Sequence, residues 1–465
     1  MNSPAPPFNR VSALGRSWRV EQGSIDAVDH TVIVAGGKGT RLAQQFGQMP
    51  KALVPIGGKP LLQHQLELVA RSGVTQVTIL AGHQGDQISR FVGEDGRYGV
   101  ETQVFVEDEP LGNAGALVRV LDLLPEQFFV LYGDVMAAVD LQRMARHHLD
   151  FGADFTSLAH PNDHPWDSDL LEADFEGRVT AIHAYPHPAD RYFGNLVNAA
   201  LYVVRREALR PWERAERHVD FTKDIMPGLI ASGRRVMAYR SSEYVKDMGT
   251  PERLLKVEAD WRAGKINLAE PRRRAPAVFF DRDGTLNVEK GFLRHADALE
   301  LTPGAGEALV ALRKAGFRLV VLTNQPVIAR GEASESDVRN IHRRLEWELG
   351  KAGAYLDAIY MCPHHPDSGF AGERPELKML CDCRKPATGL FERARLDLNI
   401  DPSASWMIGD QTRDIEMAKR AGLRSVLVQT GSAGRDRRFV ATPDYFAANL
   451  QIAAETILQH SGAGL

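Results

Sequence analysis

Residues 277–287, AVFFDRDGTLN, constrain the fold of this chain more than any other stretch, because an apolar run there delivers two aspartates into a glycine turn. Such a run predicts a buried strand with a site at its carboxyl end. Two carboxylates at this spacing can hold magnesium and attack a phosphate. Asp281 would be the nucleophile that forms an aspartyl-phosphate, and Asp283 would protonate the leaving alkoxide and later activate water. The stretch therefore predicts phosphoryl-transfer chemistry in the second half of the chain.

The first half carries a different signature, GGKGTRL at 36–42 followed by Pro50 and Lys51. A glycine-rich turn after a strand lets backbone N–H groups crowd around phosphate oxygens, which a β-carbon would obstruct. The guanidinium and ammonium groups that follow can neutralise a triphosphate and its departing pyrophosphate. The residues predicted for this task are Gly36, Gly37, Gly39, Thr40, Arg41 and Lys51. The pattern favours two enzymes in one chain.

Length and composition agree with two domains and exclude several classes of protein. A chain of 465 residues is too long for one hydrophobic core. The formal charge of −4 gives no reason to expect a nucleic acid or an anionic membrane as partner. No apolar run approaches the roughly 18 residues of a membrane span, and the first residues lack a hydrophobic signal core. We therefore expect a cytoplasmic enzyme; the sequence does not indicate its oligomeric state.

Helical and strand patterns alternate twice along the chain, which predicts an α/β fold with two doubly wound domains. Residues 1–28 lack periodicity and are interpreted as a flexible lead-in. The first alternation occupies residues 29–262 and predicts a mostly parallel, Rossmann-like sheet. Residues 263–276 contain glycine, two prolines and an arginine run, so we interpret them as a solvated linker rather than a binding patch. The second alternation fills residues 277–465.

Beyond the glycine turn, five further motifs make the first domain resemble the sugar-phosphate nucleotidylyltransferase family. They are PLGNAGAL at 110–117, LYGD at 131–134, GNLVNAALYV at 194–203, FTKDIMPGL at 221–229 and VKDMGTPERL at 245–254. The resemblance implies attack of a sugar 1-phosphate oxygen on the α-phosphorus of a nucleoside triphosphate. No protein nucleophile is required, so positioning and charge neutralisation supply most of the catalysis.

The same resemblance assigns roles to individual residues of the first domain. Arg41 would contact the leaving pyrophosphate and Lys51 the reacting phosphates. The implied magnesium ligands are Asp134 and Asp247, and the implied pocket residues are Gly112, Asn198 and Lys223. Two alternatives stay open: the aspartates could merely cap strand ends, and Lys223 could be an ordinary surface lysine.

In the second domain, three later elements follow the aspartate pair in order. Thr323 and Asn324 end the next strand, where a hydroxyl and an amide can hold the transferring phosphoryl group. Arg384 and Lys385 follow, and Lys385 gives a fixed positive charge. Asp410 then ends another strand and would join Asp281 and Asp283 at magnesium. The set resembles the haloacid dehalogenase (HAD) superfamily of phosphatases. Asp414 is either a supporting partner of the site or a helix N-cap.

All three cysteines lie between 362 and 383, which favours a metal site over a disulfide framework. Cys362, His364, Cys381 and Cys383 form a compact set that suits structural, tetrahedral zinc. His365 is a rival ligand, and free thiols in a loop are the plain alternative. With this loop, the domain resembles the heptose bisphosphate phosphatases of the histidinol-phosphatase-like branch. One departure is TNQPVIARG at 323–331, where the family pattern is TNQSGIARG.

Together the two resemblances imply successive steps. A phosphatase that removes the carbon-7 phosphate of D-glycero-D-manno-heptose 1,7-bisphosphate yields a heptose 1-phosphate, and the first domain would transfer a nucleotidyl group to it. The resemblance to guanylyltransferases acting on the α-anomer implies GTP as donor and a GDP-heptose as product. The alternatives are another sugar nucleotidylyltransferase with a different phosphatase substrate, such as histidinol phosphate, or a non-catalytic sugar-nucleotide sensor controlling the phosphatase.

Overall fold

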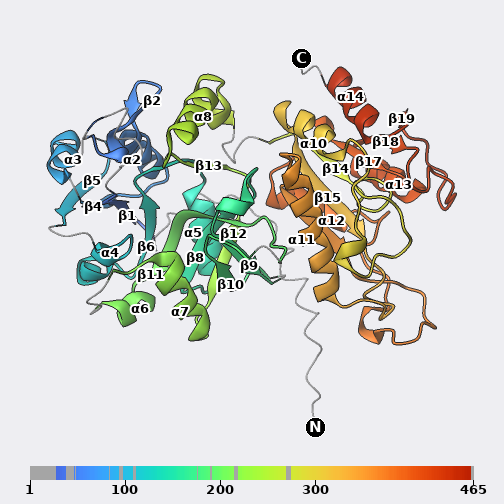
Figure 1. Ribbon diagram of the computed structural model, residues 1–465, viewed down its shortest axis with the longest axis horizontal. Coiled ribbons are helices and arrows are strands. Elements are labelled where there is room, and N and C mark those ends of the chain that lie inside the picture. Colours follow the sequence, from blue (N-terminus) through green and yellow to red (C-terminus); the bar gives the residue numbers. More distant parts are fainter. Residues whose placement is uncertain are drawn as a thin grey trace, which may run out of the picture.

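The computed structural model describes residues 28–37, 47, 49–82, 84–93, 98–107, 111–174, 176–188, 191–213, 218–268 and 274–461. These residues form two lobes, each built on its own β-sheet, with the second half of the chain beside the first (Figure 1). The expected lead-in up to residue 27 and the centre of the expected linker, 269–273, lie outside the described residues.

The first lobe contains a mixed sheet. Its parallel half has the order β5-β4-β1-β6, with β1 at His30–Ala35, β4 at Gln76–Ala81, β5 at Glu101–Val106 and β6 at Gln127–Tyr132. Its other half contains β8 (Phe155–His160), β9 (Leu170–Ala173), β10 (Val179–His183), β11 (Val197–Arg205) and β12 (Val236–Arg240). β11 runs antiparallel to β6, β8 and β9. The α/β class is confirmed, whereas the expected mostly parallel sheet applies to the first half only.

Alternate residues of these strands enter two cores. Ile33 packs against the helices α2 (Leu61–Arg71), α3 (Gly85–Val92) and α5 (Leu141–Asp150). Its neighbour Val32 packs on the opposite side, with α4 (Gly115–Arg119), α6 (Arg206–Leu209) and α7 (Met226–Ala231). Since successive strand residues point to opposite faces, the apolar run at 31–34 supplies both cores at once.

A smaller unit lies at the carboxyl edge of the first sheet. It pairs β7 (Val135–Ala138) with β13 (Tyr244–Asp247), and the short hairpin β2 (Pro55–Ile56) and β3 (Lys59–Pro60) lies near them. Helices α8 (Pro251–Arg262) and α9 (Lys265–Leu268) cover this unit and close the first lobe. In the β7–β13 pair, Val135 lies opposite Asp247. Residues 134 and 247 are therefore close in space although they are far apart in the sequence.

The second lobe has a fully parallel sheet with the order β16-β15-β14-β17-β18-β19. The strands are β14 (Ala277–Phe280), β15 (Arg318–Asn324), β16 (Ala358–Cys362), β17 (Trp406–Gly409), β18 (Arg424–Val428) and β19 (Tyr445–Ala447). Helices α10 (Ala305–Lys314), α11 (Glu335–Lys351) and α14 (Leu450–His460) pack on one face. Helices α12 (Gly389–Asp397) and α13 (Thr412–Ala421) pack on the other. This is the doubly wound domain that the sequence predicts.

The central position of β14 decides where the second site forms. The chain leaves β14 toward β15 on one side and reaches β17 on the other, so the loops diverge at the carboxyl end of β14. Ligands bind at such switch points in open α/β sheets. Among the described residues, no helix is long and apolar enough to cross a membrane.

Candidate active sites and metal centre

Three aspartates converge at the carboxyl ends of β14 and β17. Asp281 follows β14, Asp410 follows β17, and Asp414 lies in the first turn of α13. One carboxylate oxygen from each lies within 4.8 Å of the others, and all three residues are buried. Burial raises the pKa of the Asp410 carboxyl well above its usual range, and the charges of Asp281 and Asp414 raise it further. A cluster of this kind needs a cation.

Lys385 supplies one positive charge from inside the protein. Its Nζ lies 2.9 Å from Asp281 Oδ1 and 2.7 Å from Asp414 Oδ1, and its side chain is only 1% exposed. Burial by itself lowers the pKa of Lys385, but the two carboxylates outweigh it and hold the pKa above its ordinary value. The lysine is therefore a fixed cation beside the predicted nucleophile.

The site also has a carboxylate oxygen that is free to bind a metal ion. Asp410 Oδ1 is buried and has no hydrogen-bond partner among the described residues. A β-carbon on Gly431 would lie 2.4 Å from Asp410 Oδ2, and one on Gly284 would lie 2.5 Å from the same oxygen. Both glycines have positive φ, at 56° and 78°. The donor set is oxygen only, which suits magnesium.

The carboxylate of Asp283 points into a different set of contacts. Its Oδ2 lies 2.8 Å from a nitrogen of Arg282, whose side chain is fully buried, and accepts a hydrogen bond from Gln325 at 2.9 Å. Asn287 donates to Oδ1 at 3.1 Å. Burial raises the pKa of Asp283, but the Arg282 charge and these hydrogen bonds outweigh it and lower the pKa below its usual value. The predicted acid is thus next to the nucleophile, while Asp414 rather than Asp283 completes the carboxylate cluster.

Thr323 and Asn324 lie at the end of β15, beside Asp281. Asn324 Oδ1 accepts a hydrogen bond from the backbone N–H of Lys385 at 3.0 Å, and Asn324 Nδ2 donates to the Lys385 carbonyl at 3.1 Å. Thr323 Oγ1 accepts a hydrogen bond from Gln325 at 2.8 Å. The side-chain amide of Asn324, which was expected to contact the phosphoryl group, therefore makes two hydrogen bonds to the backbone of Lys385.

The Cys/His cluster is assembled as a single compact site. The Sγ atom of Cys362 lies 3.6 Å from that of Cys381, and Cys383 Sγ lies 3.3 Å from each of the other two sulfurs. His364 Nδ1 lies 3.2 Å from Cys383 Sγ. A tetrahedron with Zn–S bonds of roughly 2.3 Å has S–S edges of about 3.8 Å, so the spacing fits one zinc ion.

This cluster is linked directly to the phosphatase site. His365 lies outside it, with Nδ1 3.4 Å from the Asp367 carbonyl. The guanidinium of Arg384 donates to the His364 carbonyl at 3.0 Å, one residue before Lys385. The Cys/His loop and Asn324 therefore hold the Lys385 backbone from two sides.

In the first lobe the acidic candidates meet basic partners. Lys51 Nζ lies 3.1 Å from Asp134 Oδ2, and Asp247 Oδ1 lies 2.7 Å from an Arg253 nitrogen. The backbone N–H of Met248 donates to the Asp134 carbonyl at 2.8 Å, which brings the two loops side by side. Each carboxylate is thus paired with a cation at the carboxyl edge of the sheet.

The remaining pocket candidates of the first lobe have separate surroundings. Gly112 has a φ of 89°, and a β-carbon there would lie 2.5 Å from the Val219 carbonyl oxygen. Asn198 accepts a hydrogen bond from Ser157 at 2.8 Å and donates to the Tyr202 hydroxyl at 3.0 Å. Lys223 is exposed. Gly36 and Gly37 directly follow β1, whereas Gly39, Thr40 and Arg41 lie outside the described residues.

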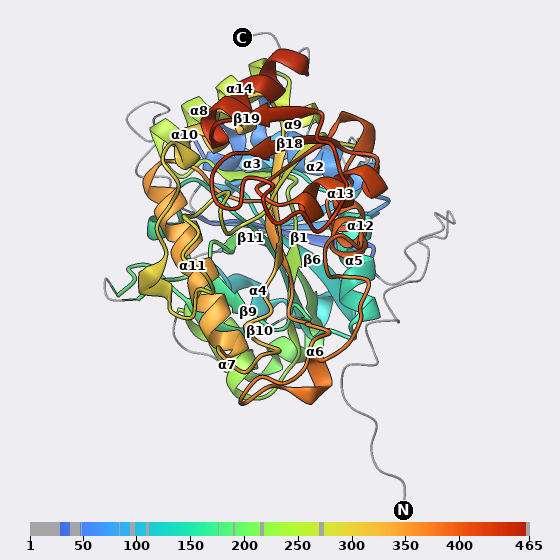
Figure 2. The same cartoon turned by 90° about the vertical axis from the view of Figure 1, so that its right-hand side faces the viewer.

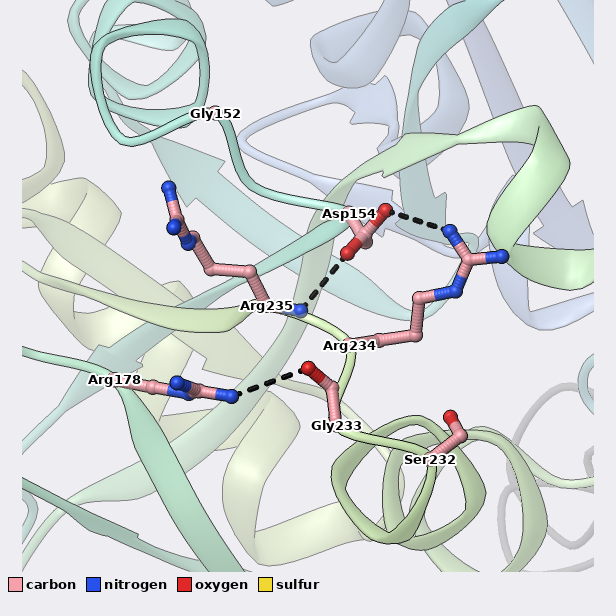
Figure 3. A pocket seen from close by; sticks show the side chains of 7 residues that line it. All are labelled: Gly152, Asp154, Arg178, Ser232, Gly233, Arg234 and Arg235. Carbon is pink, nitrogen blue, oxygen red and sulfur yellow. Dashed lines mark hydrogen bonds and ion pairs between the residues drawn. The ribbon is translucent and has the colours of Figure 1, made fainter.

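A pocket of about 340 Å³ lies at the opposite edge of this sheet, lined by Gly152, Asp154, Arg178, Ser232, Gly233, Arg234 and Arg235 (Figure 3). Asp154 and Arg235 precede β8 and β12, and β8 runs parallel to β6, so the pocket lies away from the carboxyl ends of β1 and β6. Arg234 pairs with Asp154 at 3.2 Å, and Arg178 donates to the Gly233 carbonyl at 3.2 Å. Its cations are engaged locally, and it is separate from both candidate sites.

Two features of the phosphatase site were not anticipated from the sequence. The buried Arg282 and Gln325, which fix Asp283, were missed, although Arg282 lies between the two predicted aspartates. Of the two roles left open for Asp414, the structure supports the partner role, because Asp414 pairs with Lys385. The N-cap of α13 is Gln411, and Asp414 is the third residue of its capping box, where its Oδ2 accepts the Gln411 N–H at 3.1 Å. An arginine between two such aspartates is the signal that could have pointed to the first feature.

Comparison with known protein families agrees with the two sites. A family model described as nucleotidyl transferase matches residues 30–264, and a HAD-hydrolase-like model matches residues 382–453. The D-glycero-beta-D-manno-heptose-1,7-bisphosphate 7-phosphatase of Haemophilus ducreyi is 44% identical over 159 residues, which are 34% of this chain and 85% of that protein. The chain belongs to both families. It is a nucleotidyltransferase fused to a HAD-like heptose bisphosphatase domain.

Further relatives and solved structures cover one half of the chain each. The phosphatase of the same name from Escherichia coli O6:H1 is 43% identical over 160 residues, 34% of this chain and 82% of that protein. The match to the solved structure of HddC from Yersinia pseudotuberculosis has 24% identity and a TM-score of 0.44. It covers 50% of this chain and 100% of HddC. D,D-heptose 1,7-bisphosphate phosphatase from B. bronchiseptica, complexed with magnesium and phosphate, is 31% identical over 40% of this chain and 98% of that chain, with a TM-score of 0.35.

Proposed function

We propose that this fusion enzyme hydrolyses the carbon-7 phosphate of D-glycero-D-manno-heptose 1,7-bisphosphate and then transfers a guanylyl group from GTP to the resulting heptose 1-phosphate. The observation that carries the phosphatase half is the placement of Asp281 beside Lys385, Asp410 and Asp414 at the end of β14. The identity of 44% to a heptose 1,7-bisphosphate 7-phosphatase supports the substrate.

In the phosphatase step, an Asp281 carboxylate oxygen attacks phosphorus and the bond between phosphorus and the carbon-7 oxygen breaks. The negative charge of the bound phosphate favours the protonated form of Asp283, which is held by Arg282 and Gln325, and Asp283 then gives its proton to the departing alkoxide. Asp283 then takes a proton from the water that hydrolyses the aspartyl-phosphate, which releases phosphate and restores Asp281. Lys385 neutralises charge on the nucleophile and the phosphoryl group throughout.

We propose that the side chains of Asp281 and Asp410 hold the magnesium ion, with Asp283, the third predicted ligand, beside them. Asp414 and Lys385, which pair with each other, lie next to these ligands. When bound, magnesium would balance the charge of the transferring phosphoryl group. Cys362, His364, Cys381 and Cys383 would hold a structural zinc ion, because four sulfur and nitrogen ligands leave no open position for a substrate. That ion would fix the loop that carries Arg384 and Lys385.

In the transferase step, an oxygen of the sugar 1-phosphate attacks the α-phosphorus of the triphosphate, and pyrophosphate leaves. We propose that Arg41, Lys51 and the glycine turn at 36–39 neutralise the phosphates, with Asp134 and Asp247 as magnesium ligands. The ion pairs of these aspartates with Lys51 and Arg253 would be exchanged for contacts to metal and nucleotide. Gly112 would line the nucleotide or sugar pocket, and Asn198 and Lys223 would face the sugar phosphate.

The two steps must share one anomer, because hydrolysis at carbon 7 leaves the bond at carbon 1 untouched. The resemblance to guanylyltransferases implies the α-anomer, whereas the similar phosphatases are named for the β-anomer. The full-length protein should therefore be offered heptose 1,7-bisphosphate of each anomer, with each nucleoside triphosphate and magnesium. Histidinol phosphate serves as the comparison substrate for the phosphatase.

The expected result is release of phosphate before pyrophosphate, with one GDP-heptose identified by mass spectrometry. The order follows because the cations assigned to the first domain already have phosphates to bind, which leaves none for a phosphate at carbon 7. A nucleotide-linked heptose that still carries its carbon-7 phosphate would contradict the order. Faster hydrolysis of histidinol phosphate than of either heptose bisphosphate would contradict the substrate.

A further inference from the structure

Helix α11 belongs to the phosphatase domain, but its two faces contact different domains. Its apolar face, formed by Ile341, Leu345 and Leu349, is buried in the phosphatase core under β14 and β15. The helix follows the 323–331 segment, which begins at the end of β15. In Figure 2 α11 lies in front of the first lobe, and its Arg343 contacts Glu172 of β9. The helix is therefore part of the boundary between the two enzymes.

The other face of α11 contacts the nucleotidyltransferase domain through polar groups. Arg343 forms an ion pair with Glu172 of β9, and Arg344 donates to the hydroxyl of Tyr192. The Arg344 guanidinium also lies over the Tyr192 ring, 4.7 Å from its centroid. The ring centroids of Trp347 and Tyr192 lie 6.1 Å apart.

The central contact is made by Glu346. Its Oε2 accepts a hydrogen bond from the backbone N–H of Asn195 at 3.0 Å, and Asn195 lies two residues before the start of β11. Burial raises the pKa of Glu346, and the N–H of Asn195 and the charges of Arg240 and Arg343 oppose this rise. A carboxylate in such a place is a strong acceptor for a backbone N–H group.

The segment held by Glu346 is the one that leads to the proposed sugar-side residue Asn198. From its own domain, Asn195 is fixed by Asn162, through bonds of 3.0 Å to the Asn162 N–H and 2.7 Å to its carbonyl. Glu172, which pairs with Arg343, also pairs with Arg191 at 3.2 Å. Residues 191–195 are thus held between β9 on one side and α11 on the other.

We propose that helix α11 of the phosphatase domain positions the sugar-side loop of the nucleotidyltransferase domain, with Glu346 as the positioning residue. This inference rests on the proposed function, since it takes residues 194–198 to border the sugar 1-phosphate pocket. In this arrangement, the domain that makes the sugar 1-phosphate also holds the loop beside the pocket that receives this product. Affinity for the sugar 1-phosphate then depends on the docked phosphatase.

The test uses the full-length chain with Glu346→Ala, which removes the acceptor, and Glu346→Gln, which keeps an oxygen for the Asn195 N–H. In Glu346→Ala we expect KM for the sugar 1-phosphate to rise about tenfold, the scale of one lost hydrogen bond to a charged group. KM for the nucleoside triphosphate and phosphatase turnover should change less than about twofold on the same scale. Glu346→Gln should keep KM near the wild-type value.

A matched control removes a different contact between the domains. Arg143 of α5 donates to the carbonyls of Leu396 and Asp397 at 3.4 and 2.8 Å, away from the sugar-side loop. Arg143→Ala should leave KM for the sugar 1-phosphate unchanged. An equal rise of KM in Arg143→Ala and Glu346→Ala would overturn the role of Glu346, because it would indicate general loosening of the domains.

A second measurement does not depend on which sugar is the substrate. Hydrogen exchange, followed by mass spectrometry, should be faster across residues 191–198 in Glu346→Ala and unchanged in β1 and β14. Unchanged exchange at 191–198 would overturn the inference. If exchange rises while the wild-type protein transfers no nucleotide to any sugar 1-phosphate, the positioning contact stands and the proposed transferase function fails.

Discussion

Replacing Lys385 by methionine tests the electrostatics of the phosphatase site most directly. The substitution keeps an unbranched side chain, one heavy atom shorter, and removes the charge that lies 2.9 Å from Asp281 and 2.7 Å from Asp414. Three buried aspartates would then be close together without an internal cation. Removing one partner of a buried ion pair costs about 3–5 kcal/mol when the other stays charged. The carboxylates can escape part of that cost by keeping a proton.

The pH dependence follows from the direction of the pKa shifts. Burial already raises the pKa of Asp410 and of Asp414, so the metal-free native state holds protons that the unfolded chain has released. The native state then binds more protons than the unfolded state, and stability falls as the pH rises from the ordinary carboxyl range toward the raised values. Loss of Lys385 raises the carboxyl pKa values further. Each additional retained proton steepens the fall by about 1.4 kcal/mol per pH unit.

We therefore expect Lys385→Met to cost about 3 kcal/mol of phosphatase-domain stability near pH 8 and less than about 1 kcal/mol near pH 5, in magnesium-free buffer. The assay is urea unfolding, with hydrogen exchange in β17 as the local probe. Chelators are omitted, because they would also remove zinc. Phosphatase kcat should fall about a thousandfold.

The matched control is Lys378→Met. Lys378 is also largely buried, at 8% side-chain exposure, and pairs with Glu373 at 3.3 Å away from the aspartate cluster. Its variant should show no added pH slope. A stability difference between Lys385→Met and wild type that shrinks as the pH rises would refute the reasoning.

Three further predictions concern the other groups. Asp281→Asn should abolish phosphate release, since the amide cannot act as nucleophile, while nucleotidyl transfer to supplied sugar 1-phosphate stays near the wild-type rate; substantial phosphatase turnover in this variant would rule out the covalent mechanism. Asp247→Ala should lower transferase kcat by roughly a hundredfold or more with phosphatase unchanged, measured by pyrophosphate release, and equal loss of both activities would indicate misfolding. Elemental analysis should find about one zinc per chain, and Cys381→Ser should lower both zinc content and phosphatase activity, whereas zinc-free protein with full activity would exclude the structural role.

The strand ends were the most predictable part of this protein. An apolar run that enters a glycine turn fixes which residues leave the sheet, so the ends of β14, β15 and β17 could be located from the pattern alone. The four zinc candidates were predictable because every cysteine of the chain lies within 22 residues, from Cys362 to Cys383, and metal ligation depends on residue type. The second half of the first sheet was less predictable. Antiparallel strands there do not need the helical crossovers that mark a parallel sheet.

Side-chain direction was decided only by packing. Asp281 and Asp283 are alike in the sequence, but one meets Lys385 and the other meets Arg282 and Gln325. Asn324, expected at the phosphoryl group, is instead bonded to the backbone of Lys385 from 61 residues away. Neither arrangement has a local signature, because each requires residues from strands whose order the chain does not spell out.

By itself, the sequence indicated the two enzyme classes, a phosphatase and a nucleotidyltransferase, because their motifs are residue types at characteristic local spacing. It predicted successive reactions, but it did not predict contacts between the two folded domains. Helix α11 has an apolar stripe that predicts burial within its own domain, and its polar face reads as solvated. Only the tertiary structure brought that polar face against Glu172, Tyr192 and Asn195, because complementarity between two folded surfaces arises after both have formed.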